Sequence, residues 1–138
     1  MQLELEIMCS LMYFQGRCKV PIGIEDRRIP SGALSASSSH NSRHGPDRGR
    51  LNMVAGRGRT GAWCAQRNNA GQWLQVSIHW LTLVQLLQVD FGVLGRLEGV
   101  ATQGRQDAHQ WVTSYIVSYS RNGRTFFSYK QYGRTRVR

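Results

Sequence analysis

The clearest hydrophobic pattern along the chain is an alternation of apolar and polar residues over residues 111–119. In an extended chain, one face of this stretch would carry Trp111, Tyr115, Val117 and Tyr119. A period of two, rich in aromatic and β-branched residues, is typical of a β-strand because successive side chains of a strand point to opposite faces. The pattern therefore predicts a strand over residues 111–119.

A second strand-like run follows at residues 125–129, and Asn122-Gly123 lies between the two runs. A type I′ turn needs a positive φ at both central residues, and Asn-Gly is a pair that readily adopts it. We therefore predict a β-hairpin with a two-residue turn at Asn122-Gly123.

A short apolar sequence occurs twice in the middle of the chain. Residues 72–76 read Gln-Trp-Leu-Gln-Val, and thirteen residues later residues 85–89 read Gln-Leu-Leu-Gln-Val. The repetition predicts one strand written twice. The apolar residues between the copies, 77–84, fit either a longer strand or a buried helical turn, since periodicity does not separate the two.

Residues 29–72 are rich in Ser, Gly, Arg and Asn, include Pro30 and Pro46, and show no helical period. Such a composition predicts long loops and short strands. The aromatic residues lie mostly after Ala62, so we expect the second half to contain the folded core. Taken alone, the pattern predicts a small β-sandwich.

The chain has 138 residues, which is room for one domain. An apolar run over residues 7–14 is preceded by Glu4 and Glu6, where a signal peptide would carry positive charge, so no signal peptide is predicted. No stretch approaches the roughly 18–20 apolar residues that span a bilayer.

The formal net charge is +10, and 16 of the 18 basic residues are Arg. An excess of cations favours anionic partners such as sulfated glycans, acidic lipid headgroups or nucleic acid, although scattered Arg residues can also serve only to solvate a surface. Cys9, Cys18 and Cys64 do not have the spacing of a zinc site. The four histidines accompany no nucleophile or metalloprotease motif, so no enzyme is predicted.

Four stretches together resemble the discoidin domain, the coagulation factor 5/8 C-terminal type, and occur in the order that family shows. They are Cys18-Lys19-Val20-Pro21-Ile22-Gly23-Ile24-Glu25 with Ile29-Pro30; Ala36-Ser37-Ser38-Ser39; Ala62-Trp63 with Gln72-Trp73-Leu74-Gln75-Val76; and Gly99-Val100-Ala101-Thr102-Gln103-Gly104-Arg105. Residues 111–129 extend the resemblance. It implies an all-β fold, a distorted jelly-roll β-sandwich or barrel that is incomplete here, with ligand-binding loops at one end.

On this resemblance, residues 18–138 form a partial discoidin domain with an insertion near 77–89, after an unmatched segment at 1–17. Trp63, Trp73 and Trp111 resemble core positions of the family. Cys18 and Cys64 resemble cysteines that pair with a C-terminal part of the domain. Because the sequence ends at Arg138, soon after the hairpin, we expect the closing strands to be missing and both cysteines to remain thiols.

The resemblance places three loops at the ligand-binding end, at residues 38–48, 56–61 and 105–110. The candidate ligand-binding residues in them are His40, Asn41, Arg43, His44, Asp47, Arg57, Arg59, Gln106, Asp107 and His109. Members of the family that enter membranes carry bulky apolar tips, whereas the first loop here is polar. Its donors and acceptors suit hydroxyls, carboxylates and sulfates.

Simpler interpretations of these loops stay open. The first loop suits an ordinary solvated turn region, residues 56–61 suit either an anion-binding loop or a disordered tract, and Arg105 is also placed to pair with a carboxylate such as Asp90 in a structural role.

We therefore expect a non-catalytic extracellular recognition or cell-adhesion module that binds glycans or proteins, with anionic lipid headgroups less favoured. No cofactor is predicted, and no motif indicates calcium. One alternative is a nucleic-acid-binding protein that uses Arg57, Arg59, Arg134, Arg136 and Arg138. That alternative is disfavoured because aromatic residues are missing around the Gly-Arg tract. Another alternative is a truncated product without a stable fold.

Overall fold

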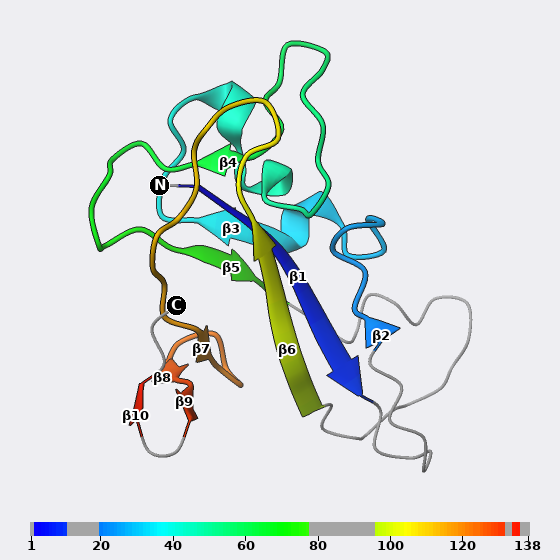
Figure 1. Ribbon diagram of the computed structural model, residues 1–138. Helices are drawn as coiled ribbons and strands as arrows, with labels where there is room; N and C mark the ends of the chain where they lie inside the picture. Colours follow the sequence, from blue (N-terminus) through cyan, green and yellow to red (C-terminus); the bar gives the residue numbers. More distant parts are fainter. Residues whose placement is uncertain (1, 11–19, 78–95, 132–133, 136–138) are drawn as a thin grey trace.

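The computed structural model describes residues 2–10, 20–77, 96–131 and 134–135 (Figure 1). The second copy of the strand sequence at 85–89, and the predicted insertion apart from Ser77, lie outside the described residues. Within them, the regular elements are β-strands and three short 3₁₀ helices. This composition is that of an all-β chain.

The elements follow one another in a simple order along the chain. The strands are β1 (Gln2–Ser10), β2 (Val20–Pro21), β3 (Leu34–Ala36), β4 (Trp63–Cys64), β5 (Leu74–Val76), β6 (Arg96–Gln103), β7 (Ser118–Tyr119), β8 (Phe127–Ser128), β9 (Lys130–Gln131) and β10 (Arg134–Thr135). The 3₁₀ helices are η1 (Ser31–Ala33), η2 (Ser42–His44) and η3 (Pro46–Arg48).

Strand β1 is the centre of the main sheet. It pairs antiparallel with β6 from Glu4↔Gln103 to Ser10↔Arg96, with a register shift after Met8. It also pairs with β2 and, near its start, with β4. The segment without family resemblance thus supplies a strand to the sheet. Because β6 runs antiparallel to β1, the loop after β6 rises to the end of the molecule where β1 begins (Figure 1).

The other strands form two-stranded ribbons: β3 with β5, β7 with β8, and β9 with β10. The strand predicted over residues 72–76 is confirmed over Leu74–Val76, which pairs antiparallel with Leu34–Ala36. The long strand predicted over 111–119 is wrong for most of its length, since β7 contains only Ser118 and Tyr119.

The buried core lies in the first half of the chain. Ile24, Ile29 and Leu34 form its centre, and Leu74, Val76 and Val100 pack against it. The other buried apolar residues are Met53, Ala62, Trp63 and Ala65. The expectation that the second half contains the core is therefore wrong for the described residues.

Buried polar groups explain how a loop-rich segment can form this core. Arg50 is 1% exposed and donates hydrogen bonds to the carbonyls of Ile24 and Ile29 and, at 3.2 Å, to that of Asp47. A third branch reaches Ser31 Oγ at 3.3 Å. A buried carbonyl without a hydrogen-bond donor costs free energy. Arg50 avoids this cost because it donates to carbonyls that have no partner in a neighbouring strand of the described structure.

The hairpin predicted around Asn122-Gly123 is confirmed, but its turn is not of type I′. Strands β7 and β8 pair at Ser118↔Ser128 and Tyr119↔Phe127, which leaves residues 120–126 as the connection. Gly123 has a φ of 68°, whereas Asn122 has no positive φ. Instead, Asn122 Oδ1 accepts hydrogen bonds from the backbone nitrogens of Arg124 and Thr125.

A two-residue turn with the backbone of type I′ occurs elsewhere, at Arg57-Gly58. Arg57 has a φ of 51° and Gly58 a φ of 74°. The flanking residues Gly56 and Arg59 exchange two backbone hydrogen bonds of 2.9 Å. The sequence did not indicate this turn, because Arg is not among the residues that favour a positive φ.

Of the three tryptophans placed in the core by resemblance, only Trp63 is buried, at 1% exposure. Its Nε1 donates to the carbonyl of Ser38 at 2.9 Å. The assignment of Trp73 and Trp111 to the core is wrong for this structure, because they are 49% and 62% exposed. An apolar sequence pattern shows which side chains would gain from burial. It does not show whether another part of the protein covers them.

Candidate functional site

The three predicted loops lie together at one end of the molecule (Figure 1). Thr60 of the second loop donates through its backbone nitrogen and its hydroxyl to the carbonyl of Arg43 in the first. The backbone nitrogen of Gly61 donates to Asp107 Oδ1 of the third loop at 3.3 Å. These contacts join all three loops into one surface, which we call the loop end.

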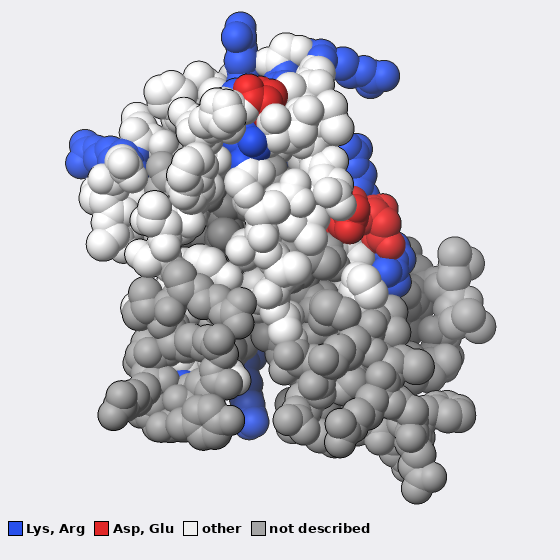
Figure 2. Space-filling model, viewed as in Figure 1, with Lys and Arg blue, Asp and Glu red and all other residues white. Residues whose placement is uncertain are grey.

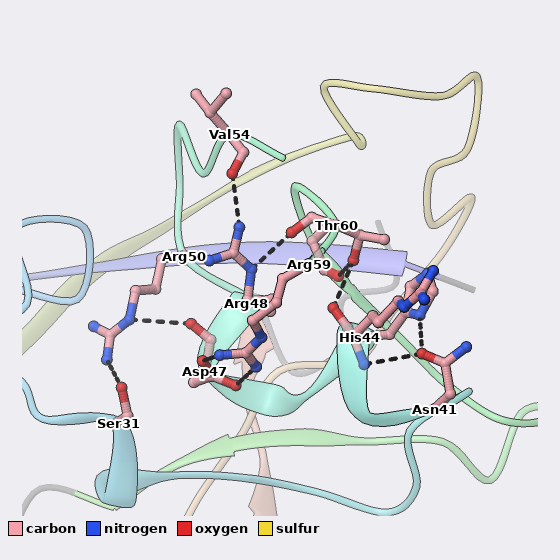
Figure 3. A network of polar contacts seen from close by, with 11 residues as sticks. Ser31, Asn41, His44, Asp47, Arg48, Arg50, Val54, Arg59 and Thr60 are labelled. Carbon is pink, nitrogen blue, oxygen red and sulfur yellow. Dashed lines mark hydrogen bonds and ion pairs between the residues drawn. The ribbon is translucent and has the colours of Figure 1, made fainter. Parts of the chain in front are cut away.

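The first loop is shaped by Asn41, which caps η2 (Figure 3). Its Oδ1 accepts from the backbone nitrogen of Arg43 at 2.9 Å and contacts His44 Nδ1 at 2.8 Å. The ring of His40 meets the buried ring of His44 edge-on, with centroids 5.3 Å apart. Burial, followed by the positive charge of Arg105, lowers the pKa of His44.

A two-point ion pair connects the first loop to the second. Arg59 donates to both carboxylate oxygens of Asp47, at 2.8 and 2.7 Å (Figure 3). Next to this pair, the buried side chain of Arg48 donates to the carbonyls of Val54 and Thr60, each at 2.7 Å. The hydrogen bonds of Arg48 and Arg59 therefore hold the second loop against η3.

The third loop is closed by Arg105. Its guanidinium donates to both oxygens of Asp107, at 2.6 and 2.8 Å, and to Gln110 Oε1 at 3.0 Å. These hydrogen bonds, together with the one from Gly61, lower the pKa of Asp107 to about 2 despite partial burial. Asp90, weighed as a partner of Arg105, lies outside the described residues, and Asp107 takes the structural role instead.

The predicted site residues thus divide into two groups. Asn41, His44, Asp47, Arg59 and Asp107 have side chains engaged in hydrogen bonds or ion pairs within and between the loops. The other exposed candidates are His40, Arg43, Arg57, Gln106 and His109. Figure 2 shows Lys and Arg side chains projecting at this end, with acidic atoms seated among them.

Sequence reasoning missed the residues that hold the loops in place, namely Arg48, Thr60 and Gln110. Arg48 closes the first predicted loop and Thr60 lies in the second, but nothing in their local sequence signals burial or a distant partner. A structural role for Arg105 was one of the alternatives left open by the sequence, with Asp90 rather than Asp107 as its partner. The sequence feature that could have indicated the partner of Arg105 is the spacing Arg-x-Asp at residues 105–107, because it allows a local ion pair.

Cys64 lies half-buried in β4 as a thiol, and burial raises its pKa. A protonated, partly buried thiol is a weak nucleophile. The described residues contain no cluster of His, Cys, Asp and Glu that would hold a metal ion. They also contain no helix long and apolar enough to cross a membrane.

The described residues form a small β-structure with a polar loop surface at one end. This is the arrangement that the resemblance to discoidin-type binding modules implies. Comparison of sequences gives the family. Residues 33–137 match the family model of the F5/8 type C domain, which covers more than half of the chain, so the chain belongs to this family. The predicted discoidin resemblance and all-β sandwich class are thereby confirmed, while the domain boundary at residue 18 stays a prediction.

Two curated relatives carry the same name. Lactadherin of Mus musculus is 34% identical over 128 residues, which cover 87% of this chain and 24% of lactadherin. Lactadherin of Rattus norvegicus is 33% identical over 128 residues, which cover 87% of this chain and 26% of that protein. The chain therefore spans about a quarter of the length of these relatives. No solved structure matches it.

Proposed function

We propose that the loop end binds an extracellular glycan or protein that presents carboxylate or sulfate groups. The family is one of extracellular binding modules, and the ligand class is argued here from the loops. The observation that carries it is the pairing of both loop acids with arginines. Asp47 faces Arg59 and Asp107 faces Arg105, whereas the exposed Arg43 and Arg57 have no acidic partner among the described residues.

The exposed groups suit this chemistry. A guanidinium donates two parallel hydrogen bonds to a carboxylate or sulfate, which adds direction as well as charge. His40, Gln106 and His109 add hydrogen-bonding groups for hydroxyls. Because hydrogen bonds already join the loops, their backbone loses little conformational entropy on binding, and the entropic cost falls mainly on the exposed side chains.

Lipid insertion is disfavoured by the same surface. The exposed predicted residues are all polar, and the large apolar side chains exposed next to the loops are Val54 and Trp111, each at 62% exposure. Insertion into a bilayer is driven by the area of apolar surface that is buried, which two side chains supply poorly.

The experiment measures binding of the chain to an array of sulfated, carboxylated and neutral glycans, followed by titration of the best binder. We expect the double variant Arg43→Ala/Arg57→Ala to weaken binding at least about tenfold, since each charged hydrogen bond contributes roughly 1.5–3 kcal/mol. Arg121→Ala, on the distant hairpin, is the matched control and should bind normally.

The identity of the ligand, together with the steepness of the salt dependence, separates this proposal from nucleic-acid binding, because ion pairs with carboxylates or sulfates are weakened by salt as well. A chain that neutralises several phosphates should lose affinity for a labelled oligothymidine steeply and linearly in log–log form. Strong, steeply salt-dependent binding to oligothymidine, with no signal on the glycan array, would overturn the proposal. Equal loss in the Arg121→Ala control would also count against the loop end.

A further inference from the structure

A second exposed surface lies on the hairpin of β7 and β8. Six large apolar or aromatic side chains between residues 111 and 129 are about half exposed or more. They are Trp111 at 62%, Ile116 at 53%, Tyr119 at 52%, Phe126 at 48%, Phe127 at 57% and Tyr129 at 46%. Scattered exposed apolar residues are ordinary, whereas those that lie together in space mark an interaction site, so the residues of the hairpin itself carry the argument.

The hairpin brings three of these rings to one face, which we call the hairpin face. Tyr119 and Phe127 are directly opposed across the ribbon, with ring centroids 6.0 Å apart and planes tilted by 33°. Tyr129 lies two residues beyond Phe127 and is therefore on the same side of the strand. Its backbone nitrogen donates to the carbonyl of Val117 at 2.7 Å, which extends the ribbon.

The charged residues of the hairpin and its flanks have one sign. Arg121, Arg124 and Lys130 are exposed in this stretch, and the sequence contains no Asp or Glu after Asp107. The connection is held in shape by its own polar groups, because Ser120 Oγ accepts from the backbone nitrogen of Gly123 and Asn122 Oδ1 accepts from Arg124 and Thr125. The cations therefore project from an ordered turn.

We propose that the hairpin face binds an extended, acidic polypeptide segment, at a site separate from the loop end. Two observations support a polypeptide. Exposed Tyr and Phe with Arg, and without Glu or Asp, is the composition of protein-protein interface centres. Moreover, a ribbon with side chains at alternate positions matches the two-residue repeat of an extended peptide.

The positive charge of the hairpin residues favours a partner that carries negative charge. A segment with carboxylates beside its apolar residues would place negative charge against Arg121, Arg124 and Lys130. A second copy of the chain is disfavoured as the occupant, because each copy carries a formal net charge of +10 and like charges repel.

The geometry also disfavours a single-stranded nucleic acid. Bases bind by stacking on open aromatic faces, whereas the rings of Tyr119 and Phe127 contact each other across the ribbon. In Figure 1 the hairpin of β7 and β8 lies at the opposite end of the molecule from the three loops, so both sites are able to bind at once.

The test uses the full chain and a fluorescein-labelled synthetic peptide of alternating Glu and Val residues, with fluorescence anisotropy as the readout. A peptide with Lys in place of every Glu is the matched probe. We expect the acidic peptide to bind and the basic peptide not to bind. The variant Tyr119→Ser/Phe127→Ser should weaken binding about thirtyfold or more, the effect typical of central interface residues.

A second variant tests the charges separately from the rings. Arg121→Gln/Arg124→Gln should weaken binding of the acidic peptide about tenfold at low salt and less at high salt. The loop-end variant Arg43→Ala/Arg57→Ala is the control and should bind the peptide normally. Because all the changed hairpin residues are exposed, unfolding midpoints should stay near that of the original chain.

Several outcomes would overturn the proposal. These are binding of both peptides alike, loss of peptide binding in the loop-end variant, or a hairpin variant that binds the acidic peptide unchanged. Concentration-dependent dimerisation abolished by Tyr119→Ser/Phe127→Ser would identify a second copy as the occupant instead. Oligothymidine or anionic vesicles that bind through the same residues while the peptide does not would identify a different ligand class.

Discussion

Asp47 and Arg59 face each other with both carboxylate oxygens and both terminal guanidinium nitrogens engaged, which joins η3 to the turn at Arg57-Gly58. The acid is 24% exposed and the arginine 40% exposed. The pair compensates the negative charge of Asp47 within the loop end, whereas Arg43 and Arg57 are exposed there.

A double-mutant cycle on this pair should give a coupling free energy of about 1 kcal/mol. Exposed pairs give roughly 0.2–1 kcal/mol, and two-point geometry with partial burial places this pair at the upper limit. Asp47→Ala, Arg59→Ala and the double variant would be unfolded in urea. A coupling energy of zero would show that the pair does not stabilise the loop.

Arg50 is expected to be the most sensitive arginine in the described structure. Arg50→Met keeps much of the side-chain volume but removes donors from the buried carbonyls of Ile24 and Ile29. The free energy of unfolding should fall by about 3 kcal/mol. The exposed Arg43→Met is the matched control and should change it by no more than about 0.5 kcal/mol. Similar losses in both variants would refute the structural role of Arg50.

Arg57 combines an unfavourable backbone conformation with a place at the loop end. Its φ of 51° is in the left-handed region, where Asn is better tolerated than Arg. Arg57→Asn should therefore raise the free energy of unfolding by about 0.5–1 kcal/mol while it weakens binding of an acidic glycan. Arg67→Asn, at an exposed position without positive φ, is the control. No gain relative to that control would argue against strain at Arg57.

The sequence allowed the all-β class, the strand at β5, the hairpin and the three loops to be predicted. These features depend on local information: period-two alternation, turn residues, and an ordered set of family motifs. The burial of Trp63 was also predicted correctly, through resemblance.

The core and the internal structure of the site were not predictable in the same way. Arg48 and Arg50 are buried because carbonyls distant along the chain need donors, and no local pattern records such a need. Trp73 and Trp111 look apolar enough for a core, yet they are exposed in this structure. In the site, the same residue type serves both to join the loops and as an exposed donor, so only the fold separates the role of Arg59 from that of Arg43.

His44 gives the loop end a pH dependence whose sign follows from its surroundings. Burial, followed by the electrostatic influence of Arg105, His40 and Arg43, lowers its pKa below 6.5, and Asp107 only partly opposes them. The folded state therefore favours the neutral imidazole. This contribution to stability is fully present above about pH 6.5 and is lost as the pH falls below that value, because the unfolded chain takes up the proton first.

We expect the urea midpoint of the original chain to fall between pH 7.5 and pH 5, and His44→Gln to reduce that fall. Gln carries an amide donor that can replace the bond from Nδ1 to Asn41 Oδ1, and it does not titrate. His109→Gln, at an exposed position in the third loop, is the control and should follow the original chain. If His44→Gln and the original chain lose stability in parallel, the buried imidazole is not the group responsible.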